Sequence, residues 1–327
     1  MNFRRFRLVF ACLMFGASAP ASYAQPNCLA TPQVSPGTTL AQLAEFYYGD
    51  IDYQYAIMLA TNARAAAGFR FVGDPFQLPQ GALLCVPQLA EAETLRNRYD
   101  TYLKAITDMA VAVPADVSHA LDPIPPGQPV TVATWIRADQ LARYKAQSGW
   151  VSTLPSDTWV TAEPHLQLFC AGFTTDNGND PDLLTLRLEQ RLGLAPHSAK
   201  TMFLSFTIAD PDPAKNIFRP CASGAIDTPT CKIRNPQDDD CGSPQAKSCT
   251  ARDIFFYKQY YGSYGAARPT GFPWTSLGYT FDWALGPADA NGHADFIRFG
   301  ESEYVVPQGT SITVVGAVTT SQYCTAN

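Results

Sequence analysis

The fold of this chain is decided by the Cys28–Pro87 segment. In order, it contains Pro36-Gly37-Thr38-Thr39-Leu40, Tyr47-Tyr48-Gly49-Asp50, Ala60-Thr61-Asn62 and Gly81-Ala82-Leu83-Leu84-Cys85-Val86-Pro87. Thr39, followed three residues later by Gln42, is typical of a helix capping box. We therefore expect a first helix over Leu40–Tyr47. It should end at Gly49, because helices commonly stop on a glycine in the left-handed conformation.

A second helix and a final strand complete this unit. Asp50 or Asp52 is suited to cap a helix that ends near Asn62. Turn signals at residues 74–75 and 79–81 then precede the short apolar strand Leu83–Val86. A unit this small buries little apolar area and usually requires a covalent staple.

The order of strand, helix, helix and strand resembles a LysM module, a small βααβ domain that binds N-acetylglucosamine-containing glycans. The resemblance covers about 55 residues. It departs from the family at Thr38, where Asp is usual, and at Gln80, where Pro is frequent. Because the two strands of that fold pair antiparallel, the resemblance implies a disulfide between Cys28 and Cys85. It also implies a shallow glycan groove lined by Gly37, Thr38, Thr39, Leu40, Asn62, Ala63 and Arg64.

The first 24 residues have the pattern of a secretory signal peptide. A basic start, Met1–Arg7, is followed by the apolar run Leu8–Phe15 and by the small-residue end Ser22-Tyr23-Ala24. We expect cleavage after about Ala24 and a periplasmic or extracellular protein.

The cysteine content agrees with export. Without Cys12, eight cysteines remain, an even number that predicts up to four disulfides. No C-x-x-C pair occurs, which argues against zinc ribbons and thioredoxin-like chemistry. The sequence does not choose the pairing among Cys170, Cys221, Cys231, Cys241, Cys249 and Cys324.

Charge and hydropathy exclude two classes of partner. The net charge is −6 and only 16% of residues are charged, whereas nucleic-acid binding requires clustered Lys and Arg. No apolar run after the leader approaches 18 residues, so we expect no membrane span in the mature chain. A weakly acidic surface suits an uncharged glycan or an envelope protein partner.

The rest of the chain predicts an α+β fold. A LysM-like domain (25–88) is followed by a connecting helix and a Pro-rich linker (89–129), and then by a larger, disulfide-stapled, mostly-β domain (130–327). Helical patterns are expected near residues 138–146 and 183–192. Strands are expected at Val130–Trp135, Trp159–Ala162, Leu166–Phe173, Met202–Ile208, Tyr304–Val306 and Ser311–Ala317.

Aromatic residues concentrate between Ile254 and Trp283, where eleven of thirty positions are Phe, Tyr or Trp. We expect most of these rings to form core. Trp274, Tyr279 and Trp283 are the expected exceptions, because exposed aromatic rings stack on sugars.

Four acids suggest an enzymatic alternative: Asp282, Asp295, Glu301 and Glu303. Paired carboxylates beside a sugar platform are the machinery of glycoside cleavage. However, a strand-like sequence follows the Glu301-Ser302 pair, which excludes a lytic transglycosylase pattern, and we interpret these acids as solvated loop residues.

Metal and nucleophilic chemistry have weak signals. The four histidines lack paired ligand spacing, and the Asp-rich stretches 176–182 and 238–240 do not match a calcium loop. We therefore expect no cofactor, metal or catalytic residue. The leading hypothesis is an exported, non-enzymatic protein that binds peptidoglycan or a related GlcNAc-containing glycan. The alternative is a LysM-targeted cell-wall hydrolase that uses the carboxylates of the C-terminal domain.

Overall fold

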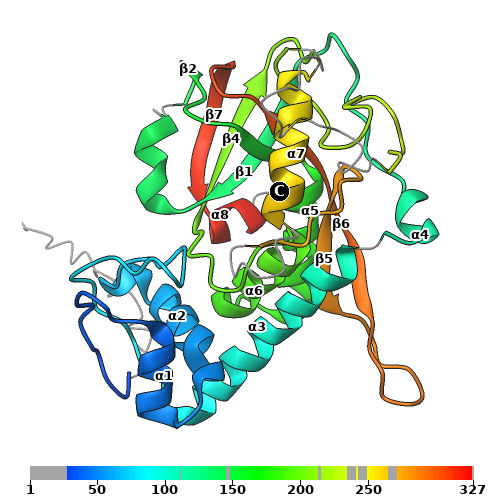
Figure 1. The fold of residues 1–327 in the computed structure, drawn as a ribbon. Coiled ribbons are helices and arrows are strands. Elements are labelled where there is room, and N and C mark those ends of the chain that lie inside the picture. Colours follow the sequence, from blue (N-terminus) through cyan, green and yellow to red (C-terminus); the bar gives the residue numbers. More distant parts are fainter. Residues whose placement is uncertain are drawn as a thin grey trace, which may run out of the picture.

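Two short stretches at the ends of the N-terminal unit run antiparallel. Ala30 is bridged to Val86, and Gln33 to Leu83. Between them the chain forms α1 (Leu40–Tyr48), the 3-10 turn η1 (Ile51–Tyr53), α2 (Gln54–Ala63) and the 3-10 turn η2 (Ala65–Ala67) (Figure 1). The computed structural model describes residues 28–110, 112–144, 148–212, 215–233, 241, 249–263 and 271–325. The expected signal peptide, the acids at 238–240 and Tyr264 of the aromatic cluster lie outside these ranges.

The local signals of the N-terminal unit form as predicted. The Thr39 hydroxyl accepts the Gln42 N–H at 3.1 Å, and the Thr39 N–H donates to the Gln42 side chain at 3.2 Å. Gly49 ends α1 with a φ of 71°. Asp50 caps the 3-10 turn η1 and not α2. Helix α2 therefore begins one turn after Asp50, at Gln54. The disulfide between Cys28 and Cys85 is present.

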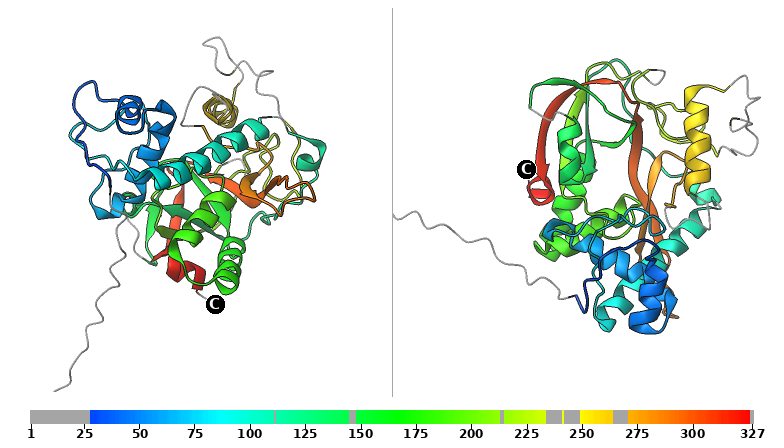
Figure 2. Two further views of the ribbon diagram at one scale, coloured as in Figure 1. Left: turned by 90° about the horizontal axis from the view of Figure 1, so that it is seen from below. Right: turned by 60° about the vertical axis from the view of Figure 1, so that its left-hand side comes forward.

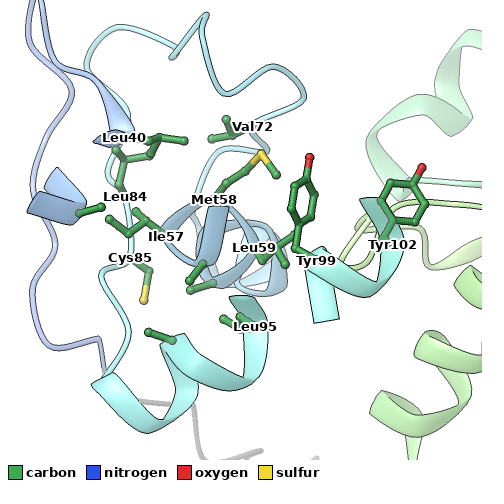
Figure 3. Packing of buried hydrophobic residues seen from close by; sticks show 14 of the residues in the cluster. Leu40, Ile57, Met58, Leu59, Val72, Leu84, Cys85, Leu95, Tyr99 and Tyr102 are labelled. Atoms are coloured by element: carbon green, nitrogen blue, oxygen red, sulfur yellow. The ribbon is translucent and has the colours of Figure 1, made fainter. Parts of the chain in front are cut away.

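Helix α3 (Leu89–Met109) connects the N-terminal unit to the rest of the molecule. Its Leu95 and Tyr99 pack into the core of the N-terminal unit (Figure 3). One turn further on, the Tyr102 ring lies 5.6 Å from that of Trp283 and its hydroxyl donates to the Gly271 carbonyl at 3.2 Å. A single cluster of buried residues therefore runs from Val34 to Trp283.

The Pro-rich segment after α3 is held against the C-terminal region. It contains the short helix α4 (Pro114–Val117). The backbone N–H groups of Leu121 and Ile124 donate to Pro229 and Ile226 carbonyls, both at 2.8 Å. The segment thus belongs to the folded body and is not an extended spacer.

The C-terminal region is built on a seven-stranded antiparallel sheet with the order β2-β7-β4-β1-β3-β6-β5, so the predicted α+β class is confirmed. The strands are β1 (Val130–Ile136), β2 (Val151–Thr153), β3 (Thr158–Ala162), β4 (Met202–Ile208), β5 (Tyr279–Leu285), β6 (Phe296–Val306) and β7 (Ser311–Thr319). The sequence did not predict β2, β5 or residues 296–303 of β6.

One expected strand was wrong. Residues 166–173 lie in α5 (His165–Asn177). Leu166, Cys170 and Thr174 are its buried positions, and their spacing of four residues is that of one helix face. The other helical elements are η3 (Ala138–Tyr144), α6 (Pro181–Arg191), α7 (Ala251–Ser263) and α8 (Thr320–Thr325).

The sheet curls strongly upon itself. In the sheet order β6 and β7 are separated by three strands, yet they are joined by residues 307–310 alone. The Thr310 N–H donates to the Pro307 carbonyl at 3.2 Å, which makes this connection a tight turn. Neighbouring strands are spaced about 4.8 Å apart, so a flat sheet would leave β6 and β7 too far apart for such a turn. In the right view of Figure 2, the chain passes at the top directly from β6 (orange) into β7 (red).

The inner face of the curled sheet forms one core and its outer face is covered by helices. Side chains of β1, β3, β4, β6 and β7 meet inside, among them Val132, Phe206 and Tyr304. Trp135 and Phe203 point outward and pack with α5, α6 and α8. Disulfides join Cys170 to Cys324, Cys221 to Cys231 and Cys241 to Cys249. Disulfides are typical of extracellular and periplasmic proteins. Among the described helices, none has the length and apolar character to cross a bilayer.

Candidate functional site

The seven residues expected to line a glycan groove divide into exposed and buried sets. Gly37, Thr39 and Ala63 are exposed and Thr38 is partly exposed. In contrast, Leu40, Asn62 and Arg64 are no more than 5% exposed. The surface that this set presents is therefore limited to Gly37–Thr39 and Ala63.

The two buried polar side chains of the set are engaged within the fold. The Asn62 amide donates to the Val72 carbonyl at 3.0 Å and accepts the Val72 N–H at 2.8 Å, which fixes the long connection after α2. Arg64 donates to both carboxylate oxygens of Glu91, at 3.0 and 3.2 Å, and so ties the end of α2 to the first turn of α3. Both residues have structural partners.

The loop ahead of α1 is held in a single conformation. The Thr38 N–H donates to the Ser35 carbonyl at 3.0 Å, and the Ser35 N–H donates to the Thr38 hydroxyl at 3.0 Å. Gly37 has a φ of 85°, in the left-handed region that favours glycine. Among the described residues, no atom lies within 4 Å of the position that a Cβ would take there, so the backbone of this loop is open to a ligand.

The acids of the enzymatic alternative are not solvated loop residues, and that expectation was wrong for three of the four. Asp282, Glu301 and Glu303 lie on strands and are no more than 6% exposed. Only Asp295 is exposed, with 88% of its side chain accessible. The strands that carry the buried acids were not evident locally, which explains the error.

Two of the buried acids form ion pairs with α6. Arg187 donates to both oxygens of Asp282, at 3.0 and 2.7 Å, and Arg191 donates to Glu301 at 2.7 Å. The Arg191 guanidinium also lies 3.7 Å from Asp282. These ion pairs offset the charge of both carboxylates and fasten α6 to β5 and β6.

The expected aromatic exceptions are part of the core. Trp274, Tyr279 and Trp283 are no more than 2% exposed. The Trp283 indole N–H donates to the carbonyls of Glu189 and Leu194, at 3.2 and 2.9 Å. Trp283 lies on β5, an edge strand that contacts both α3 and α6. Tyr279 packs with the rings of His119 and Phe299, and Trp274 packs with Phe256 of α7. The three expected exceptions do not form an exposed sugar platform.

A cavity of about 530 Å³ lies where the N-terminal unit, α3 and the curled sheet meet. Residues 71–73, Tyr99 and Tyr102 line one side, and residues of β1 and β3 line another. The loop of residues 192–200 and residues 271–274 close it further. Sequence reasoning missed this site, since its lining comes from segments that are distant in the chain.

Comparisons with protein-family models, curated proteins and solved structures find no match to this chain. Within the described ranges, no group of three or more His, Cys, Asp or Glu side chains is arranged to hold a metal ion.

Proposed function

We propose that this is an exported cell-envelope protein whose N-terminal unit is a LysM-like domain that binds peptidoglycan or a related GlcNAc-containing glycan. The observation that carries the proposal is the sequence order from Pro36-Gly37-Thr38-Thr39-Leu40 to Gly81–Pro87. Two helices between antiparallel ends, closed by the Cys28–Cys85 disulfide, support it. The C-terminal domain is proposed to be non-enzymatic, because two of its candidate catalytic acids, Asp282 and Glu301, form ion pairs with arginines.

The glycan contact is assigned to the exposed loop Gly37–Thr39. Its backbone is open and rigid, and a preorganised surface loses little conformational entropy on binding. Leu40, Asn62 and Arg64 act behind that surface by holding α1 and the connection after α2.

Retention of the full mature chain on purified peptidoglycan tests this assignment. Thr38→Asp restores the acid usual in LysM modules and keeps an acceptor for the Ser35 N–H, so it should increase retention. Thr38→Arg removes that acceptor and places a bulky cation on the loop, so it should reduce retention.

Thr94→Arg is the matched control, because Thr94 is an exposed threonine on α3, away from the loop. It should leave retention unchanged. If the wild-type chain is not retained where another LysM protein is, or if both arginine variants behave alike, the glycan assignment is wrong.

A further inference from the structure

The cavity occupies a gap in the sheet between β1 and β3. These strands pair only at Val132↔Ala162 and Ala133↔Thr161. Beyond that point β1 stays paired with β4, and β3 stays paired with β6, so the two strands diverge. The residues that would otherwise continue the pairing, 134–136 and 158–160, line the cavity.

The walls of the cavity are largely apolar and aromatic. Its volume of about 530 Å³ lies within the range of sites that enclose small organic molecules. Aromatic residues from four separate parts of the fold are among its lining residues: Tyr102 of α3, Trp135 of β1, Trp159 of β3 and Phe272. Flat aromatic walls favour a ligand that itself carries a ring.

A cation, the Lys200 ammonium, belongs to a residue that lines the cavity. The Lys200 ammonium donates to the Trp135 carbonyl at 2.6 Å. Within the described part of the chain, no carboxylate oxygen lies within 4 Å of it as an ion-pair partner. Burial lowers the pKa of Lys200 to about 8, a value at which the ammonium form still predominates at neutral pH. An unpaired cation in an apolar cavity favours an anionic ligand group.

Two polar groups without partners line the cavity on the neighbouring strands β3 and β6. Thr161 and Glu303 face each other across β3 and β6. Both line the cavity and are 6% exposed, yet the Thr161 hydroxyl and one Glu303 oxygen have no hydrogen-bond partner in the described structure. Burial raises the pKa of Glu303 to about 8, so at neutral pH it is a neutral acid that can donate a hydrogen bond. Buried groups of this kind usually have a partner, which a ligand oxygen would supply.

The loop that carries Lys200 is held rigidly. Glu189 of α6 accepts the backbone N–H groups of His197 and Ser198, at 3.0 and 2.7 Å, and the Ser198 hydroxyl at 3.0 Å. His197 and Ala199 adopt φ values of 54° and 55°, a conformation that non-glycine residues rarely hold without support. The surroundings thus fix the position of Lys200 before any ligand arrives.

We propose that this cavity binds a ring-bearing carboxylic acid that carries a second oxygen at its far end. The carboxylate pairs with the Lys200 ammonium, and the distal oxygen bonds to Glu303 and Thr161. The carbonyl that accepts from Lys200 belongs to Trp135, two residues along β1 from Ala133, the register partner of Thr161. Glu303 lies one strand beyond Thr161. Strand rise and strand spacing therefore separate Trp135 from Thr161 and Glu303 by roughly 8–12 Å. A phenolic acid of the hydroxycinnamate type has this length. The assignment does not depend on glycan binding by the N-terminal unit.

Isothermal titration of the full mature chain with 4-hydroxycinnamate tests the proposal. The amide of the same acid lacks the charge, and cinnamate lacks the distal hydroxyl. We expect the acid to bind, and the amide and cinnamate each to bind at least tenfold more weakly. Absence of binding by 4-hydroxycinnamate and by the longer 6-hydroxy-2-naphthoate, both at about 5 mM, would overturn the proposal.

Lys200→Met isolates the charged end, since it keeps the apolar stem of the side chain. This variant should bind acid and amide equally, while Lys104→Met, on the exposed face of α3, should keep the wild-type preference. Should Lys200→Met fail to fold, the comparison of acid with amide on the wild-type chain still decides the point. Equal affinity of the two probes for the wild-type chain contradicts a role for Lys200.

Discussion

Replacement of Glu303 by Gln should remove a pH dependence from the stability of the protein. Glu303 is buried on β6, and burial raises its pKa from 4.5 to about 8, against a smaller opposing effect of the Arg219 charge. The native state therefore holds a proton on this side chain between pH 4.5 and 8, whereas the unfolded state does not. The contribution of Glu303 to the free energy of unfolding is fully present below pH 4.5 and is lost as the pH rises to 8.

The size of the effect follows from the pKa difference. Each pKa unit corresponds to about 1.4 kcal/mol, so the shift of Glu303 corresponds to roughly 4–5 kcal/mol between pH 4.5 and 8.5. Gln keeps the shape of the side chain and does not titrate. Glu189 and His197 also titrate in this range, with pKa values of about 7 and about 4, but they are present in both proteins. The difference between the two proteins therefore reports Glu303.

Urea unfolding of both proteins, with disulfides intact, at pH 5.0, 6.5 and 8.0 measures this difference. The advantage of the Gln variant over wild type should grow with pH and approach several kcal/mol at pH 8. Parallel stability curves, or an advantage that shrinks as pH rises, would show that Glu303 is charged in the fold and stabilised by Arg219. That result would refute the description of this group as a neutral donor.

Three further substitutions test the supports of the fold. Cys28→Ala opens the 57-residue disulfide loop of the N-terminal unit and should cost about 4 kcal/mol of unfolding free energy; an unchanged urea midpoint would count against the staple. Asp282→Asn breaks a buried two-bond pair with α6 and should cost about 3–5 kcal/mol, whereas Asp295→Asn, at an exposed position, should have no measurable effect in the same assay. Gly300→Ala places a methyl group 2.1 Å from a threonine oxygen and should lower the melting temperature strongly, while Gly316→Ala, which meets nothing within 4 Å, should not. Similar melting temperatures for the two alanine variants would contradict the tight packing of β6.

Features with short-range causes were predictable from the sequence. The capping box at Thr39, the glycine stop at Gly49 and the amphipathic pattern of α3 each depend on residues a few positions apart. β1 and β4 are short segments rich in β-branched and aromatic residues and were found for the same reason. The Cys28–Cys85 pairing was predicted from the LysM resemblance, which implies two antiparallel strands, and not from residues close in the sequence.

Features with long-range causes were not predictable. α5 was mistaken for a strand because residues 166–173 are apolar on several sides and their helical spacing emerges only beside α6 and α8. Asp282 looked like a solvated acid because its arginine partner lies 95 residues away. The cavity depends on where β1 and β3 stop pairing, and no local pattern marks that point.

The central claim is that the loop before α1 binds GlcNAc-containing glycans, and competition measures it most directly. The full mature chain is retained on purified peptidoglycan and then challenged with soluble GlcNAc oligomers, in parallel with Thr38→Asp. The account predicts that the oligomers release wild type in a saturable way, and that Thr38→Asp requires less oligomer for half-maximal release because its site binds them more tightly. Retention that GlcNAc oligomers do not compete, or an absence of retention in both proteins, would contradict it.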